Sequence, residues 1–231
     1  TVLEHKDFLI KPTNFNVPYD AERIHGISTE LAEEQGISLN EGLILFNKAL
    51  EKTTFIVGQN LNFDLNIMGC EFHRLGIENK LSSLPILDTC TEKTALMCKI
   101  PGGRGGKFKL PTLTELHTHL FGTGFGEAHN ATADVEATTR CFLELIRLRE
   151  FTKEQLDVDE AYFKNFSEQN PTPIQVIGLK HINLKKESDR IRKRLEKLKN
   201  TESTESTSEG LAALENVQFT HLHNHTQFSV L

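Results

Sequence analysis

The spacing of apolar positions predicts several helices in the first two thirds of the chain. Residues 38–52 give the clearest one, because Ser38 and Glu41 can form a capping box. Its buried face would be made by Leu39, Leu43, Phe46 and Leu50. Further helices are predicted at residues 63–75, from Thr89 or Thr91 to about residue 99, and at residues 113–120. A short helix capped by Ser28 or Thr29 is predicted after residues 24–27.

Three short runs between these helices have the composition of strands. Residues 54–58 form a continuous apolar run typical of a buried strand, and residues 84–88 and 6–11 are further candidates. A strand, a turn and a helix follow one another at residues 54–75. This order places side chains at the carboxyl end of a sheet, where open α/β folds bind ligands. We therefore expect an α/β fold.

Residues 129–145, HNATADVEATTRCFLEL, combine an apolar helical pattern with candidate chemistry. Its apolar face would be made by Val135, Thr138, Phe142 and Leu145. Asp134 lies near the predicted helix start, where the helix dipole favours a carboxylate. A helix through both residues would set His129 about 140° away from Asp134. His129 can therefore share a site with Asp134 only from the loop that leads into the helix.

A second carboxylate has a similar setting. Asp64 lies in the first turn of the helix predicted after the 54–58 strand. Carboxylates at helix starts can bind a divalent metal, and a histidine beside them can deprotonate a water molecule. The alternative is that Asp134 is an ordinary helix-start carboxylate and His129 a surface loop residue. The setting of Asp64 favours the metal-site interpretation.

Composition fits a globular protein without a membrane segment. The chain has 231 residues, of which 38% are hydrophobic and 25% charged. Its formal charge of −6 does not indicate a nucleic-acid-binding protein, but it allows an enzyme whose acidic residues bind metals. It shows no apolar run long enough to span a bilayer and no signal-peptide pattern. Its four cysteines form no CxxC pair and are interpreted as reduced, mostly buried thiols of a cytoplasmic protein. Both ends look cut, since the chain begins at Thr1 and stops in a strand-like run.

The chain changes character after Arg149. Residues 151–170 are polar and acidic, and residues 171–179 form a short possible strand. Residues 185–199 predict a strongly basic helix, interpreted as a solvated helix that packs lightly on a neighbour. Residues 201–210, TESTESTSEG, predict a flexible linker.

Two further stretches could bind ligands. The glycine-rich basic loop at residues 101–109 lacks the GK[ST] of a phosphate-binding loop. It is interpreted as a mobile loop, with a weak contact to a nucleic-acid backbone as the functional alternative. Near the end, His221, His223 and His225 alternate, so a strand would point them to one face, as suits a metal. A purification tag is the alternative, and the intervening leucine and asparagine argue against it.

Three segments together resemble the DEDDh 3′–5′ exonucleases, the family that includes the proofreading subunit of bacterial DNA polymerase III. They are IHGIST from Ile24, GQNLNFDLNIM from Gly58 and HNATADVEAT from His129. The resemblance implies that Asp64 and Asp134 bind the metals and that His129 is the general base. It also implies that the substrate terminus lies near His25, Gly26, Ile27, Asn60 and Phe63.

This family has a ribonuclease H-like α/β fold with a mixed sheet flanked by helices. The implied reaction is hydrolysis of the terminal phosphodiester of a DNA strand with two Mg²⁺ or Mn²⁺ ions. Activity should fall below about pH 6.5, the ordinary histidine pKa, because the base must be neutral. The family's first motif, Asp-x-Glu on the central strand, has no counterpart here. We therefore expect an exonuclease fold truncated at its amino end that is inactive alone and poorly stable.

The segment HLHNHTQFS from His221 resembles the opening strand of the PHP domain of the DNA polymerase III alpha subunit. His223 and His225 would be its metal ligands, for Zn²⁺ or Mn²⁺. Together the resemblances predict an exonuclease domain at residues 1–150, a polar connector at 151–215 and a PHP start at 216–231.

These resemblances imply part of a DNA-directed DNA polymerase that carries its own proofreading exonuclease. Its partners would be a single-stranded 3′ end, primer–template DNA and replicase subunits such as the sliding clamp, with no membrane. Two alternatives stay open. One is a free-standing exonuclease acting on DNA or RNA ends, and the other is a catalytically dead exonuclease fold kept as a binding module.

Overall fold

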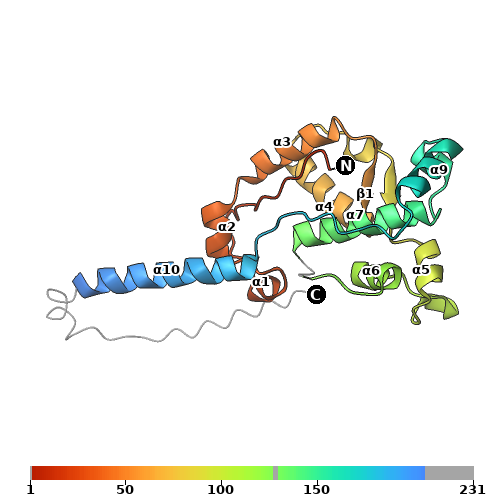
Figure 1. The fold of residues 1–231 in the computed structure, drawn as a ribbon. Coiled ribbons are helices and arrows are strands. Elements are labelled where there is room, and N and C mark those ends of the chain that lie inside the picture. The colour runs from red at the N-terminus through yellow and green to blue at the C-terminus, as the bar shows by residue number, and fades with distance from the viewer. Residues whose placement is uncertain (1, 127–129, 206–231) are drawn as a thin grey trace. The chain divides into compact units, whose positions relative to one another are not determined.

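The computed structural model describes residues 2–126 and 130–205, and these fall into two units (Figure 1). The first unit is Thr1–Ser188, and the second begins at Asp189. The predicted linker beyond residue 205, the predicted PHP strand and the histidines of residues 221–225 lie outside the described residues.

The described residues form helices around a very small sheet. In chain order the elements are α1 Tyr19–His25, α2 Thr29–Gln35, α3 Leu39–Leu50, β1 Ile56–Gly58, α4 Leu61–Arg74, the 3₁₀ turn η1 Leu81–Ser83, β2 Ile86–Asp88, α5 Glu92–Cys98, the 3₁₀ turn η2 Arg104–Gly106, α6 Leu113–Phe121, α7 Ala131–Arg147, α8 Lys153–Leu156, α9 Glu160–Gln169 and α10 Leu184–Glu205.

The helix starts follow the predicted caps. Ser28 Oγ accepts a hydrogen bond from Leu31 N–H at 3.1 Å and starts α2, and Ser38 Oγ accepts from Glu41 N–H at 3.2 Å and starts α3. Of the two candidates for α5, Thr91 is the cap, and it forms a capping box with Thr94. These caps are confirmed because a cap needs only a side chain and the backbone three residues away. At α3 only the Ser38 half of the predicted capping box is present, whereas α5 has both halves of its box.

The sheet consists of β1 and β2, which pair in parallel with Ile56 opposite Ile86 and Gly58 opposite Asp88. The connection between them contains α4, as a parallel crossover requires. The strand predicted at residues 6–11 is wrong. Only Ile10 forms a bridge, to Ile37. That partner lies between α2 and α3, so the backbone beside it turns into helices and no ladder can extend.

Two apolar clusters hold the first unit together. One joins Leu43 and Leu50 of α3 to Phe72 and Leu81. The other includes Leu116 of α6 and Leu145 of α7, and it also includes residues beyond 150: Phe151, Leu156 and Phe163. The residues after Arg149 therefore pack in the same core as α6 and α7.

The buried face of α7 differs from the predicted one. Of the four predicted positions only Leu145 is fully buried, at 1% exposure, whereas Val135 is 53% exposed. The buried positions are Thr132, Ala133, Ala137, Cys141, Glu144, Leu145 and Ile146. The apolar pattern was misleading because a buried, paired glutamate occupies the packed face.

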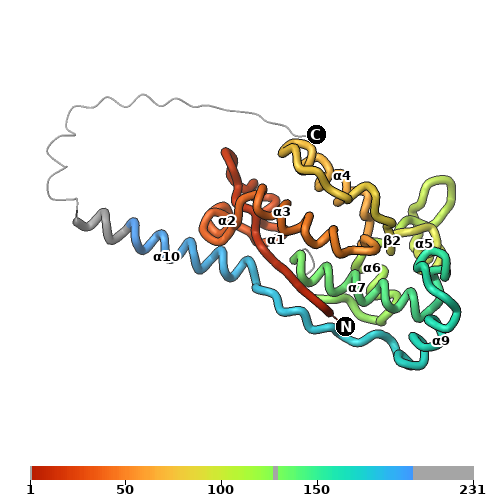
Figure 2. The backbone as a smooth tube through the Cα atoms, turned by 90° about the horizontal axis from the view of Figure 1, so that it is seen from above, coloured from red at the N-terminus to blue at the C-terminus, as the bar shows by residue number. Residues whose placement is uncertain are grey.

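The strand predicted at residues 171–179 is also wrong. This segment has no regular structure and instead bonds to side chains of α7. Ile174 N–H donates to Glu144 at 3.0 Å, and the N–H groups of Ile177, Gly178 and Leu179 all donate to the Glu136 carboxylate at 2.9–3.0 Å. Carboxylates thus satisfy backbone donors that a sheet would otherwise pair. Figures 1 and 2 show this segment passing along α7.

The predicted basic helix is confirmed as α10, but it continues to Glu205 and includes the first residues of the predicted linker (Figure 2). The four cysteines are free thiols, but the expectation that they are mostly buried is wrong: Cys141 is buried, Cys90 and Cys98 are half-buried and Cys70 is exposed. Burial raises the pKa of the Cys141 thiol to about 12. Among the described helices, none is long and apolar enough to cross a membrane.

Candidate metal and nucleic-acid site

Asp64 is placed by the turn between β1 and α4. Asn60 adopts a left-handed conformation with φ of 61°, which turns the chain into the helix. Asp88 at the end of β2 accepts hydrogen bonds from Asn60 N–H and Leu61 N–H, both at 2.9 Å. The second strand therefore fixes the start of α4, and Asp64 lies in its first turn as predicted.

Asp134 is placed by a similarly anchored helix start. Asn130 caps α7 by accepting hydrogen bonds from Thr132 N–H at 3.1 Å and Ala133 N–H at 3.3 Å. The Asn130 side chain also donates to Ile182 O at 3.1 Å, and Thr132 Oγ1 donates to the Asp7 carboxylate at 2.8 Å. Asp134 lies in the first turn, as the sequence predicted.

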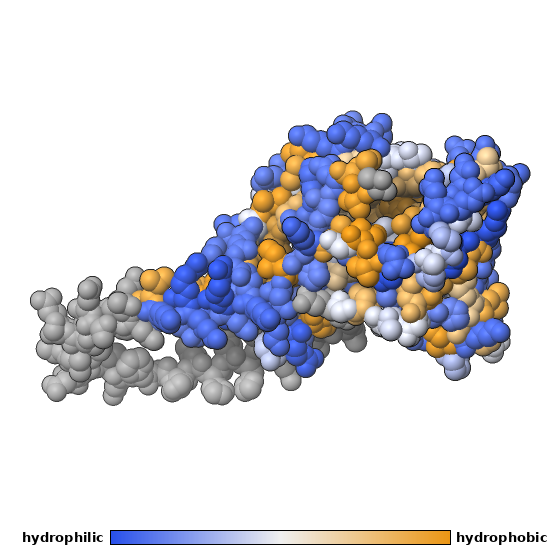
Figure 3. Space-filling view, in the orientation of Figure 1, coloured by the Kyte–Doolittle hydropathy of each residue, from blue (hydrophilic) through white to orange (hydrophobic). Residues whose placement is uncertain are grey.

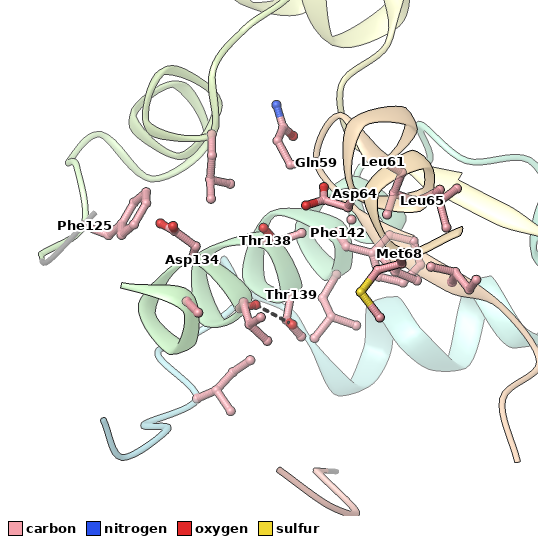
Figure 4. Close-up of a pocket in the computed structure, with 18 of the residues that line it drawn as sticks. Gln59, Leu61, Asp64, Leu65, Met68, Phe125, Asp134, Thr138, Thr139 and Phe142 are labelled. Carbon is pink, nitrogen blue, oxygen red and sulfur yellow. Dashed lines mark hydrogen bonds between the residues drawn. The ribbon is translucent and has the colours of Figure 1, made fainter. Parts of the chain in front are cut away.

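One cavity of about 1260 Å³ brings the two carboxylates together. Asp64 and Asp134 both line it, with Gln59 and Thr138 as polar neighbours among a mostly apolar lining. Figure 4 shows Asp64 on α4 and Asp134 on α7, with the Asp134 carboxylate directed toward Phe125. The residues 70 positions apart in sequence thus share one space.

Two carboxyl groups among the cavity lining have the chemistry to bind a cation. Burial raises the pKa of the Asp64 carboxyl, its own backbone hydrogen bond opposes this, and the nearby Asp88 raises it further. A divalent cation would stabilise the charged form of such a carboxyl. Carboxylate oxygens are the ligands that Mg²⁺ and Mn²⁺ prefer. In the described part of the chain no group of three or more His, Cys, Asp or Glu side chains is arranged to hold a metal ion.

Strand β1 presents one edge to this cavity. All three of its residues, Ile56, Val57 and Gly58, line the cavity, whereas no residue of β2 does. Since β2 pairs with one edge of β1, the edge that faces the cavity is the opposite one. Within the described residues that edge has no strand beside it.

The predicted substrate-binding residues lie outside the cavity lining. His25, Gly26 and Ile27 end α1 and lead into α2, and Asn60 and Phe63 lie at the start of α4. Phe63 is 63% exposed. His25 Nδ1 accepts a hydrogen bond from Ile27 N–H at 3.0 Å, and burial lowers the pKa of this histidine while Glu22 raises it. The predicted base His129 and the predicted ligands His223 and His225 lie outside the described residues.

A buried histidine holds the segment that leads toward residue 129. His117 of α6 is 1% exposed. Its Nδ1 donates to Thr123 O at 2.8 Å, since Nε2 must accept the 2.9 Å hydrogen bond from Arg140 Nη1. The Phe125 ring lies 5.3 Å from the His117 ring and lines the cavity. Burial lowers the pKa of His117, the Thr123 hydrogen bond opposes this, and Arg140 lowers it further.

Sequence reasoning missed three polar residues around the site. Gln59 lines the cavity and is held by Thr89 Oγ1 and by its own hydrogen bond to Pro111 O at 2.8 Å. Thr138 lies one helical turn after Asp134, so its i+4 spacing could have revealed it. Asp88 accepts hydrogen bonds that fix the start of α4. In the sequence, its place at the end of a predicted strand was the only feature that could have indicated this role.

A model of the exonuclease family RNase_T matches residues 1–142. The chain belongs to this exonuclease family. The match covers Asp64 and Asp134, and it shows an enzyme family of ribonuclease H-like α/β fold that hydrolyses nucleic acids with divalent metal ions. The mixture of helices and a small parallel sheet agrees with that fold. No curated protein matches the chain.

Proposed function

We propose that this exonuclease domain removes nucleotides from the 3′ end of a DNA strand by hydrolysing the terminal phosphodiester. The observation that carries the proposal is the meeting of Asp64 and Asp134 in one cavity. Both aspartates occupy the first turn of a helix, and both lie within the match to the exonuclease family.

In the proposed mechanism Asp64 and Asp134 hold the metal ions through their carboxylate oxygens. Two bound Mg²⁺ or Mn²⁺ ions supply a positive clamp for the attacking and leaving oxygens. His129 takes the proton from the attacking water, and it therefore acts in its neutral form. His25, Gly26 and Ile27, with Asn60 and Phe63, contact the terminal nucleotide, and the exposed Phe63 ring offers a stacking surface for a base.

We propose that further carboxylates reach the site on a strand that pairs with the open edge of β1. That edge faces the cavity, and apolar side chains that a strand could cover line the same space: Leu65, Met68 and Phe142. An Asp-x-Glu strand at this place would put two carboxylates beside Asp64. Without such a strand the site would keep two carboxylates and an uncovered apolar surface, so we expect weak activity and low stability in its absence.

We further propose that the domain proofreads for a DNA polymerase III alpha-type chain, with Zn²⁺ or Mn²⁺ at His223 and His225 of a PHP start. The support is the short segment from His221 and the linker-like composition before it. A free-standing exonuclease on DNA or RNA ends is equally compatible with the family match.

The test uses the protein expressed from its complete reading frame. It is incubated with a 5′-labelled single-stranded DNA, the same sequence as RNA, and a DNA carrying an internal label, each with Mg²⁺, with Mn²⁺ or with EDTA. We expect a ladder shortening from the 3′ end, release of nucleoside monophosphates and no reaction in EDTA. Internal cleavage, shortening from the 5′ end or activity in EDTA would contradict the proposal, and a preference for RNA would favour the free-standing enzyme.

A further inference from the structure

Ser188, near the start of α10, forms hydrogen bonds with the loop that follows α1. Ser188 Oγ donates to Gly26 O at 2.7 Å and accepts from Ser28 N–H at 3.0 Å, and Ser188 is 2% exposed. A Cβ at Gly26 would lie 2.9 Å from Lys185 N, so the loop fits the start of α10 only with glycine there. The start of α10 is therefore part of the folded unit that holds the cavity, although it lies beyond the family match.

Charge is distributed very unevenly between α10 and the rest of the chain. Residues 184–199 contain eight Lys and Arg against three Asp and Glu, a net charge of +5. The whole chain carries −6, so all other residues together carry −11. A protein with this balance has no general affinity for a polyanion, and any attraction must come from a local positive surface.

Four of the eight basic residues at positions 184–199 lie along one narrow stripe of α10. All four are exposed and fall within about 60° of one another around the helix axis, and we call them the cationic stripe: Lys186, Arg190, Lys193 and Lys197. The other four lie elsewhere around the helix. The acidic residues Glu187, Asp189 and Glu196 fall at least about 40° outside this arc. Figure 3 shows strongly hydrophilic side chains over α10.

We propose that the cationic stripe binds the phosphate backbone of a nucleic acid. The stripe is about 16 Å long at 1.5 Å per residue, a length over which a strand presents several phosphates. The inference rests on the proposed function only in taking nucleic acid as the ligand, and it gives α10 a role separate from hydrolysis.

The experiment measures binding of a fluorescein-labelled 20-nucleotide single-stranded DNA and of a hairpin duplex by anisotropy. The full-length protein is used in EDTA, so that hydrolysis is silent, over a series of NaCl concentrations. The stripe variant is K186Q/R190Q/K193Q/K197Q, and glutamine keeps a helix propensity close to that of lysine and arginine. The matched control is K48Q/K52Q/K80Q/K164Q, which removes four exposed lysines elsewhere. Far-UV circular dichroism checks that both variants fold.

We expect the stripe variant to bind at least about tenfold more weakly at low salt, with a plot of log affinity against log salt flatter by about 3, as four lost phosphate contacts predict for a single strand. The control variant should retain the slope of the wild type. Equal losses in the two variants, or unchanged binding by the stripe variant, would overturn the inference. If stripe-dependent binding occurs in a protein without nuclease activity, the proposed function fails and this inference stands.

Discussion

The side chains of α7 fall into two groups with different surroundings. Ala137, Cys141 and Leu145 are buried, and Cys141 and Leu145 belong to the core cluster that joins α7 to α6 and α9. Asp134 and Thr138 instead line the cavity. A single helix therefore both anchors the fold and presents a carboxylate to the site.

Two carboxylates of α7, Glu144 and Asp134, show how different these surroundings are. Glu144 is 2% exposed, accepts from Arg147 Nε at 3.0 Å and accepts from Ile174 N–H at 3.0 Å. The Glu144 oxygens therefore hold α7, Arg147 and the segment at Ile174 together. Asp134 lines the cavity that Asp64 also lines. Changes at Glu144 should therefore affect stability, and changes at Asp134 should affect activity.

The largest effect is expected from Asp134→Asn in the full-length protein. We expect exonuclease activity to fall by more than about 100-fold, the upper end of losses for residues that only support a metal ligand. The melting temperature should change little because the amide has the same shape. Asp20→Asn, another carboxylate in the first turn of a helix, is the control and should keep full activity. Retention of a tenth of the activity by Asp134→Asn would argue against a metal-binding role.

Shortening a buried side chain of α7 should cause the largest loss of stability. Leu145→Ala removes a side chain that is 1% exposed and should lower the free energy of unfolding by about 2–5 kcal/mol. Val135→Ala, on a residue that is 53% exposed, should cost less than about 0.5 kcal/mol. Urea denaturation of both variants measures the difference. Similar losses of unfolding free energy in the two variants would contradict the difference in packing between Leu145 and Val135.

Glu144→Gln should give a smaller loss of stability. Glutamine keeps the shape but removes the charge that Arg147 contacts, and charged hydrogen bonds contribute about 1.5–3 kcal/mol. Glu160→Gln is the matched control, because its pair with Arg149 is exposed and should be worth at most about 1 kcal/mol. Urea midpoints that order the two variants the other way would contradict the structural role of Glu144.

The smallest effect is a pH dependence from His117. Burial lowers its pKa in the folded protein below the 6.5 of the unfolded chain. Below pH 6.5 the unfolded state therefore binds more protons than the folded state. The contribution of His117 to the free energy of unfolding is complete above pH 6.5 and is lost as the pH falls below it. Melting temperatures between pH 7.5 and 5.5 should therefore drop more for the wild type than for His117→Gln. Parallel curves for the two proteins would show that His117 does not titrate in this way.

Local signals allowed the sequence to predict the helix starts at Ser28, Ser38 and Thr91 and both strands of the sheet. Asp64 and Asp134 could be identified because each follows a turn into an amphipathic helix. Their meeting in one cavity came from the expected fold rather than from periodicity.

The failures involve distant partners. The segment at residues 171–179 looks like a strand, but its N–H groups bond to Glu136 and Glu144, more than 29 positions earlier in the chain. The packed face of α7 was misplaced because Glu144 is buried by Arg147 and Ile174, which an apolar pattern cannot register. The support that Asp88 gives to the start of α4 likewise depends on the pairing of β1 with β2.

The most direct test of the account is Mn²⁺ binding, followed by electron paramagnetic resonance of the full-length protein. The account predicts that Asp64→Asn and Asp134→Asn each weaken binding at the cavity by at least about tenfold, the smaller loss typical even of supporting residues. Glu144→Gln should bind Mn²⁺ like the wild type. If either aspartate variant binds Mn²⁺ as the wild type does, Asp64 and Asp134 do not hold a shared metal and the central claim fails.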